Sequence, residues 1–166
     1  MRSVLLLLAV LCTSAACRDQ SRLPEPVNIA LPRAIDGRPW SFADRRSEAT
    51  IVFFFSTWCV PCQAMEPFVA EAARIGPREG IEVIGVALDV AGNKTVAPYV
   101  QATEPPYPVL LGGGAIAEGR SPFGRIPSLP SVIFLDGDGR PSAVIQGLVD
   151  TELLMTRARE VRSRTD

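Results

Sequence analysis

Two cysteines, Cys59 and Cys62, are separated by two residues in the segment WCVPC at 58–62. Sulfur atoms at this spacing can be joined within one helical turn, so the pair could exchange disulfides with other thiols. The pair could also supply part of a metal site, or form an inert bridge that only constrains the chain. The residues around the pair help to decide among these three kinds of chemistry.

The flanking sequence places the pair where a strand gives way to a helix. Residues 51–55 (IVFFF) are apolar throughout and rich in strand-forming types, and residues 61–75 have the pattern of a helix. Cys59 is therefore expected at a helix N-terminus, where free backbone N–H groups and the partial positive charge of the helix stabilise a thiolate. Only the thiolate attacks a disulfide, and Cys62 lies close enough to resolve the mixed disulfide that results.

The composition argues against the other two uses of the pair. The chain has 166 residues, four cysteines and no histidine, and its other cysteines, Cys12 and Cys17, lie near the N-terminus. A zinc or copper site would need further thiolate or imidazole ligands, and a bridge across so small a loop would constrain the unfolded chain little. We therefore expect dithiol chemistry with no metal and no other cofactor, because the pair itself carries both electrons.

The same composition excludes whole classes of protein. Without histidine there is no Ser-His-Asp triad and no Cys-His protease pair. A hydrophobic content of 47% with 21% charged residues is typical of a folded domain. The formal net charge of −1 offers no electrostatic basis for binding nucleic acid.

Residues 1–16 are typical of a secretory signal peptide. Arg2 supplies a positive start, residues 4–11 (VLLLLAVL) form an apolar run, and the small residues at 14–16 suit a cleavage site. The apolar run is shorter than the roughly 20 residues that span a bilayer. We therefore expect the protein to be exported.

Cys17 would be the first residue after that cleavage. The stretch SAAC at 14–17 resembles a bacterial lipoprotein signal, in which the cysteine carries lipid, although Ser14 stands where leucine is usual. Lipid on Cys17 would also account for an odd number of exported cysteines. A free exported chain is the alternative. We expect residues 17–26 to be a tether and residues 27–166 to form the folded domain.

The elements around the cysteines predict an α/β fold with a mixed central sheet. Strands are expected at 51–55 and 81–88, with the helix between them in a right-handed crossover. Residues 27–31 and 40–42 flank Asp36-Gly37 and predict a hairpin at the N-terminal end of the domain.

The second half of the domain begins with an insertion. It is expected to hold a short helix at 95–102 and a flexible loop at Gly112-Gly113-Gly114. Residues 131–135 and 142–145 flank the turn sequence DGDG and predict a second hairpin. A last helix should begin after Asp150 or Thr151 and pack one apolar stripe on the sheet, formed by Leu154, Ala158 and Val161.

The WCVPC segment after an apolar strand resembles the active site of the thioredoxin superfamily. Pro67 matches the helix-kinking proline of that family, and the stretch LPSVIFLD at 129–136 resembles the residues around its cis-proline. The resemblance therefore implies a thioredoxin-like fold in which Pro130 is the cis-proline. The signal segment, the opening hairpin and the insertion are similar to the exported, membrane-tethered TlpA/ResA-like thiol:disulfide oxidoreductases.

The resemblance also implies roles for the residues of the site. Cys59 would attack a substrate disulfide and Cys62 would resolve the mixed disulfide, while Leu129 and Pro130 would shape the groove for the substrate backbone. Pro61 fits the first helical turn, where a missing N–H costs nothing, and Trp58 can shield one side of the sulfur pair.

The implied partners are protein thiols and disulfides at the periplasmic face of a bacterial membrane. Apocytochrome c and copper-site assembly proteins are the substrates that the resemblance suggests. A membrane reductase would resupply electrons, because the compartment itself is oxidising.

Two departures from the family concern proton transfer. Phe53 stands where thioredoxins bury an acid, and Met65 stands where many TlpA/ResA-like members have glutamate. Glu66 is one residue further on and shares a helix face with both cysteines. It could take over the acid-base role, or it could be a solvated or tethering carboxylate.

Other functions on the same fold would need residues that the chain lacks. A peroxiredoxin-like peroxidase would need threonine and proline where Ser56 and Val52 stand, and a copper-delivery protein would need a distant histidine. A non-catalytic binding module with a permanently closed disulfide is a further alternative, and the direction of electron flow is left open.

Overall fold

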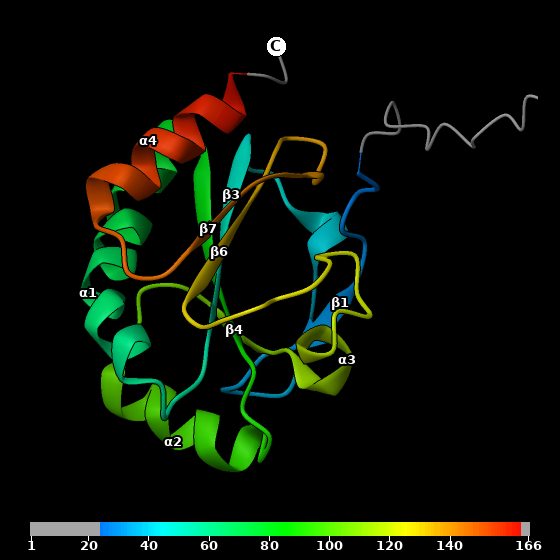
Figure 1. Ribbon diagram of the computed structural model, residues 1–166, viewed down its shortest axis with the longest axis vertical. Helices are drawn as coiled ribbons and strands as arrows, with labels where there is room; N and C mark the ends of the chain where they lie inside the picture. The colour runs from blue at the N-terminus through cyan, green and yellow to red at the C-terminus, as the bar shows by residue number, and fades with distance from the viewer. Residues whose placement is uncertain (1–23, 164–166) are drawn as a thin grey trace, which may run out of the picture.

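The central element of the fold is β3 (Ala49–Phe55), in which all seven side chains are buried. A strand that hides consecutive residues must be covered on both faces. In the computed structural model, which describes residues 24–163, β3 is the middle strand of a five-stranded sheet of order β5-β4-β3-β6-β7 (Figure 1).

The sheet is mixed, as the sequence predicted. On one side of β3, both further strands run parallel to it. On the other side, the neighbouring strand is antiparallel to β3, and the edge strand is antiparallel to that neighbour. Their bounds are β4 (Ile81–Ala87), β5 (Val109–Leu111), β6 (Ser131–Leu135) and β7 (Pro141–Gln146).

Three helices cover one face of the sheet. They are α1 (Val60–Ile75), α2 (Asn93–Thr103) and α4 (Thr151–Arg162), which lie together on one side in Figure 1. Asp150 caps α4 by accepting a hydrogen bond from the backbone N–H of Leu153 at 2.9 Å. The expected stripe of Leu154, Ala158 and Val161 is fully buried, which confirms the predicted face of α4.

The other face is covered by the N-terminal hairpin and a short helix. The hairpin pairs β1 (Ala30–Pro32) with β2 (Pro39–Ser41), and α3 (Gly113–Ala117) lies beside it (Figure 1). A bridge between Arg33 and Leu110 joins the hairpin to the edge strand β5. Single turns of 3-10 helix occur at Phe42–Asp44 and Gly76–Glu79.

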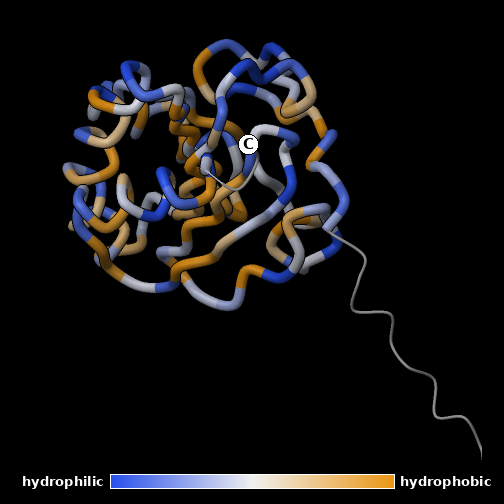
Figure 2. Tube along the Cα trace, turned by 90° about the horizontal axis from the view of Figure 1, so that it is seen from above, coloured by the Kyte–Doolittle hydropathy of each residue, from blue (hydrophilic) through white to orange (hydrophobic). Residues whose placement is uncertain are grey.

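Alternate side chains of β3 enter two cores. Phe53 and Phe55 face the helical layer, where their rings stack with centroids 5.2 Å apart. Phe54 faces the hairpin side and meets Phe123 edge to face at 5.1 Å. Figure 2 shows hydrophobic colour gathered on segments of the chain in the interior of the molecule.

The structure corrects the prediction of a flexible loop at the three glycines. Gly113 and Gly114 begin α3, and Gly112 is buried. A Cβ atom at Gly112 would lie 2.5 Å from a methyl carbon of Leu88, so glycine is needed there for close packing rather than for flexibility. The insertion also supplies β5, an edge strand of the main sheet, which the nearby prolines concealed in the sequence.

The first described residues run along the turn between β6 and β7. The backbone N–H of Val27 donates to the Gly139 carbonyl at 2.9 Å, and the Arg140 guanidinium donates to the Pro24 carbonyl at 2.9 Å. The expected signal peptide at 1–16, Cys17 and most of the expected tether lie outside the described residues. None of the helices within residues 24–163 has the length and apolar character needed to cross a membrane.

Candidate active site

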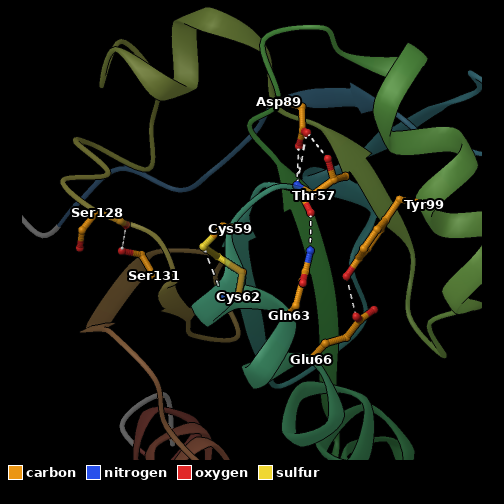
Figure 3. The surroundings of a disulfide bond; sticks show 9 residues. All are labelled: Thr57, Cys59, Cys62, Gln63, Glu66, Asp89, Tyr99, Ser128 and Ser131. Carbon is orange, nitrogen blue, oxygen red and sulfur yellow. Dashed lines mark hydrogen bonds between the residues drawn. A yellow bond between two sulfur atoms is a disulfide. The ribbon is translucent and has the colours of Figure 1, made fainter.

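Cys59 and Cys62 form a disulfide at the point where the chain leaves β3 and enters α1 (Figure 3). Their Cα atoms are 5.2 Å apart. Cys59 is the N-cap residue of α1, with an extended backbone, and its sulfur accepts a hydrogen bond from the Cys62 backbone N–H at 3.3 Å. The predicted position of the pair at a strand-to-helix junction is confirmed.

The N-terminal turn of α1 has the features that stabilise a cysteine thiolate. Pro61 occupies the first turn, and no acidic residue lies in that turn. The free N–H groups and the helix dipole therefore act on Cys59 without an opposing carboxylate on the same turn. A reduced Cys59 thiolate would lie where these groups stabilise it.

The disulfide is buried under an apolar rim. Cys59 is 6% exposed and Cys62 is 2% exposed, whereas Trp58 and Val60 are each 71% exposed. The large apolar side chains that flank the first cysteine therefore project into solvent instead of packing in the core. Such side chains are available for contact with another polypeptide.

A cis peptide bond joins Leu129 to Pro130, as the resemblance implied. Pro130 is buried, Leu129 is partly buried, and the Pro130 carbonyl accepts the N–H of Gly147 at 2.9 Å. The loop is closed by the Ser131 hydroxyl, which donates to the Ser128 carbonyl at 2.6 Å. In Figure 3 these serines lie on one side of the disulfide, and Glu66 lies on the other.

Glu66 is engaged by a residue of α2. The Tyr99 hydroxyl donates to its carboxylate at 2.5 Å, and in Figure 3 the carboxylate points toward Tyr99 and away from the sulfur atoms. Burial, together with this hydrogen bond and the charge of Glu66, raises the pKa of Tyr99 well above its ordinary range. The geometry agrees with the tethering interpretation of Glu66, since the carboxylate connects α1 with α2.

The two positions that lack the family acids are filled by apolar packing. Phe53 is 1% exposed and Met65 is fully buried, and both belong to the core on the helical side of the sheet. Neither position can hold or release a proton.

Three polar residues next to the disulfide were not singled out in the sequence. Asp89 follows the end of β4 and accepts hydrogen bonds from the backbone N–H and the hydroxyl of Thr57. The Gln63 side chain donates to the Thr57 carbonyl at 2.7 Å. A signal existed, because an acid that ends a strand parallel to β3 must lie at the same edge of the sheet as the cysteines.

The side chains within residues 24–163 include no group of three or more histidine, cysteine, aspartate or glutamate residues that could hold a metal ion. The two cysteines are joined to each other. The site as it stands can carry out thiol–disulfide exchange with its own sulfur atoms.

The fold and the site together define a thioredoxin-like protein with a Cys-x-x-Cys disulfide at the start of a helix. Residues 42–161 match the model of the thioredoxin-like domain family, and the chain belongs to that family.

Several proteins similar to this chain are named as thiol-disulfide oxidoreductases. The thiol-disulfide oxidoreductase ResA of Bacillus thuringiensis subsp. konkukian (strain 97-27) is 27% identical over 114 residues, which are 68% of this chain and 63% of that protein. The match thus spans less than two thirds of the length of this relative.

Two solved structures illustrate the likeness of the fold. A thiol:disulfide interchange protein of the thioredoxin family from Chlorobium tepidum TLS superposes with a TM-score of 0.71 at 25% identity, over 85% of this chain and 97% of that one. The exposed lipoprotein thioredoxin Etrx1 of Streptococcus pneumoniae strain TIGR4 gives a TM-score of 0.68 at 17% identity, over 80% of this chain and 98% of that one.

Proposed function

We propose that the chain is an exported thiol-disulfide oxidoreductase that reduces disulfides in other proteins. The observation that carries this proposal is the Cys59–Cys62 disulfide at the N-terminus of α1, with an apolar rim and a cis-proline loop in the same site. The chain's membership of the thioredoxin-like family and its similarity to the ResA relatives support the same activity.

The reaction begins with the reduced pair. The Cys59 thiolate attacks one sulfur of the substrate disulfide, which breaks that bond and releases the other substrate sulfur as a thiolate that takes up a proton. The Cys62 thiol then loses its proton and attacks the Cys59 sulfur. The mixed disulfide breaks, the second substrate thiol leaves, and the Cys59–Cys62 bond forms. Two electrons pass from the pair to the substrate.

The proposed substrates are disulfides formed by the cysteines of apocytochrome c or of copper-site assembly proteins, which the reaction converts to thiols. A membrane reductase would return two electrons to the oxidised pair, since an exported protein works in an oxidising compartment. The basis for these partners is the similarity to the ResA relatives and the TlpA/ResA-like resemblance of the sequence.

The proposed location is the periplasmic face of a bacterial membrane, with Cys17 lipidated after removal of residues 1–16. The signal pattern of the sequence supports export, and the lipoprotein-like stretch SAAC supports the anchor. Residues 17–26 would connect the lipid to the folded domain.

Insulin reduction with dithiothreitol as electron source tests the activity. The wild-type chain should accelerate precipitation of the insulin B chain, and Cys59→Ser should abolish that acceleration because it removes the sulfur that is proposed to attack first. Full activity in Cys59→Ser would overturn the mechanism. An inactive wild type would favour the binding-module alternative, and consumption of hydrogen peroxide without insulin reduction would favour a peroxidase.

Cys62→Ser is the matched variant that separates the two sulfur roles. It keeps the attacking thiolate and removes the resolving thiol, so mixed disulfides should accumulate on Cys59 and be visible on non-reducing gels. If Cys59→Ser traps partners instead, the assignment of the two roles is reversed.

A further inference from the structure

Asp89 is the one buried acidic side chain in the described part of the chain, at 6% exposed. A buried carboxylate is costly unless hydrogen bonds satisfy it. None of the ion pairs formed within residues 24–163 includes Asp89. Its charge is therefore held by neutral donors, and the identity of those donors indicates what the residue does.

Most of these donors belong to Thr57. The Thr57 backbone N–H approaches the two carboxylate oxygens at 3.0 and 3.3 Å, and the Thr57 hydroxyl donates to one of them at 2.5 Å. The hydroxyl of Thr95, in the first turn of α2, approaches the same carboxylate at 3.3 Å. Figure 3 shows Asp89 directed at Thr57 from the end of β4.

Thr57 is also held from its other side, and it lies two residues before Cys59. Its carbonyl accepts the Gln63 side chain at 2.7 Å, and the next turn is closed by the Cys59 N–H, which donates to the Ser56 carbonyl at 3.1 Å. The backbone that leads into the first cysteine is thus fixed by Asp89 on one side and by α1 on the other.

We propose that Asp89 is a positioning residue for thiol exchange: by holding Thr57, it keeps Cys59 at the N-cap of α1, where the sulfur faces the free N–H groups of the helix. This inference rests on the proposed function of Cys59 as the attacking thiolate. Asp89 acts through Thr57, because the hydrogen bonds of both carboxylate oxygens are directed to Thr57 and Thr95.

The positioning role predicts which feature of Asp89 matters. Asparagine keeps an oxygen that can accept the Thr57 N–H, and its amide can donate to the Thr57 hydroxyl, so Asp89→Asn should preserve the anchor without the charge. Alanine removes the anchor. Thr57→Val removes only the hydroxyl contact and should have an intermediate effect.

The experiment measures alkylation of Cys59 by iodoacetamide as a function of pH. It uses a background of Cys12→Ser, Cys17→Ser and Cys62→Ser, so that Cys59 is the one cysteine left to react. Asp89→Ala should react about tenfold more slowly at pH 7, with its profile displaced to higher pH, because the apparent pKa of the thiol rises by about one unit when the sulfur leaves the helix N-terminus. Asp89→Asn should stay within about twofold of the parent and Thr57→Val should be slowed about threefold, since both keep the Thr57 N–H bond.

Asp136 provides a matched control at the other end of the sheet. Its carboxylate also accepts a backbone N–H, from Arg140 at 2.8 Å, and a hydroxyl, from Ser142 at 3.1 Å. Asp136→Ala removes an equivalent carboxylate from a turn far from the cysteines, and should leave the alkylation profile unchanged.

Three results would overturn the proposal. The first is an alkylation profile in folded Asp89→Ala that matches the parent. The second is a loss of alkylation rate in Asp89→Asn as large as in Asp89→Ala. The third is a displacement of the Asp89→Asn alkylation profile to lower pH, which would mean that the charge of Asp89 acts directly on the Cys59 sulfur. If Asp89→Ala does not fold, a parental profile in Thr57→Val overturns it. Alkylation needs no protein substrate, so failure of insulin reduction in the wild type would reject the proposed function separately.

Discussion

The two ends of the sheet differ in where their charged side chains lie and in what binds them. At the amino ends of β3 and β4, exposed arginines pair with glutamates, as in the contacts of Arg159 with Glu79 at 2.6 Å and of Arg162 with Glu48 at 3.6 Å. At the carboxyl ends of the same strands, the buried Asp89 is bound by neutral donors, and the exposed side chains on either side of Cys59, Trp58 and Val60, are uncharged.

This difference shows which end of the sheet can bind another polypeptide with little loss of hydration free energy. An uncharged, apolar rim loses water readily on contact, whereas a charged surface must give up its hydration. Exposed ion pairs contribute little to stability and are screened by salt. The end with the disulfide is therefore suited to binding and exchange, and the other end to solvent.

Among the variants that test this difference between the two ends, the largest effect is expected at the rim formed by Trp58 and Val60. Trp58→Ala should raise the KM for insulin about fivefold with little change in kcat, because an exposed aromatic side chain at a contact is worth roughly 1 kcal/mol. Reduction of a small disulfide such as hydroxyethyl disulfide should change by less than about twofold, since so small a substrate does not need the rim.

Val144→Ala is the control for this prediction. Val144 is also apolar and 56% exposed, but it lies on β7. Its replacement should leave both reactions unchanged. Equal losses on insulin and on the small disulfide in Trp58→Ala would contradict a role in contact with the substrate.

A smaller effect is expected for Glu66→Gln. Glutamine keeps an oxygen that can accept the Tyr99 hydroxyl, so the connection between α1 and α2 should survive. We expect less than about a twofold change in insulin reduction at pH 7, since general acid-base roles contribute at least about 100-fold. A tenfold or larger loss, with unchanged thermal stability, would restore Glu66 as the proton acceptor for Cys62.

The smallest effect on catalysis is expected for replacement of Glu79, which lies at the end of the sheet opposite the disulfide. A hydrogen bond from Arg159 holds the pKa of Glu79 below its ordinary value of 4.5. Because the pKa is lower in the folded chain, the ionised carboxylate stabilises the fold above that value, and the contribution is lost as the pH falls through the pKa of the folded state.

Glu79→Gln should therefore lower Tm at pH 7 but not at strongly acid pH, and 1 M salt should shrink the difference. Insulin reduction should match the wild type. Thermal melts across pH test this, with Glu71→Gln as a control, because Glu71 meets Arg74 only at 3.4 Å on an exposed surface. A pH-independent difference in Tm would show that the charge of Glu79 is not what stabilises the fold.

The parts of the site that depend on local sequence could be predicted. A few consecutive residues were enough to predict the buried strand at IVFFF, the position of Cys59 and Cys62, and the proline loop at Pro130. The burial of β3 on both faces followed from an apolar run without alternation.

The contacts between distant segments could not be predicted in the same way. Thr57 and Asp89 are 32 residues apart, and they meet because parallel pairing of β3 with β4 brings the two strand ends to one edge. The direction of the Glu66 carboxylate depended on Tyr99, which lies 33 residues further along the chain in a helix whose packing the sequence did not define.

If the chain is anchored through Cys17, as proposed, the attachment of residues 24–27 to the β6–β7 turn limits the distance between the disulfide and the membrane. Leu135, before that turn, pairs with Thr50 at the start of β3, whereas the cysteines follow the end of β3. Figure 1 shows the turn and the start of α1 at opposite ends of the molecule. A chain anchored through Cys17 could place the turn at most roughly 25 Å from the lipid surface, and the length of β3 adds about 23 Å. The cysteines would then be presented outward, to partners whose reactive sulfur atoms reach into the space above the bilayer.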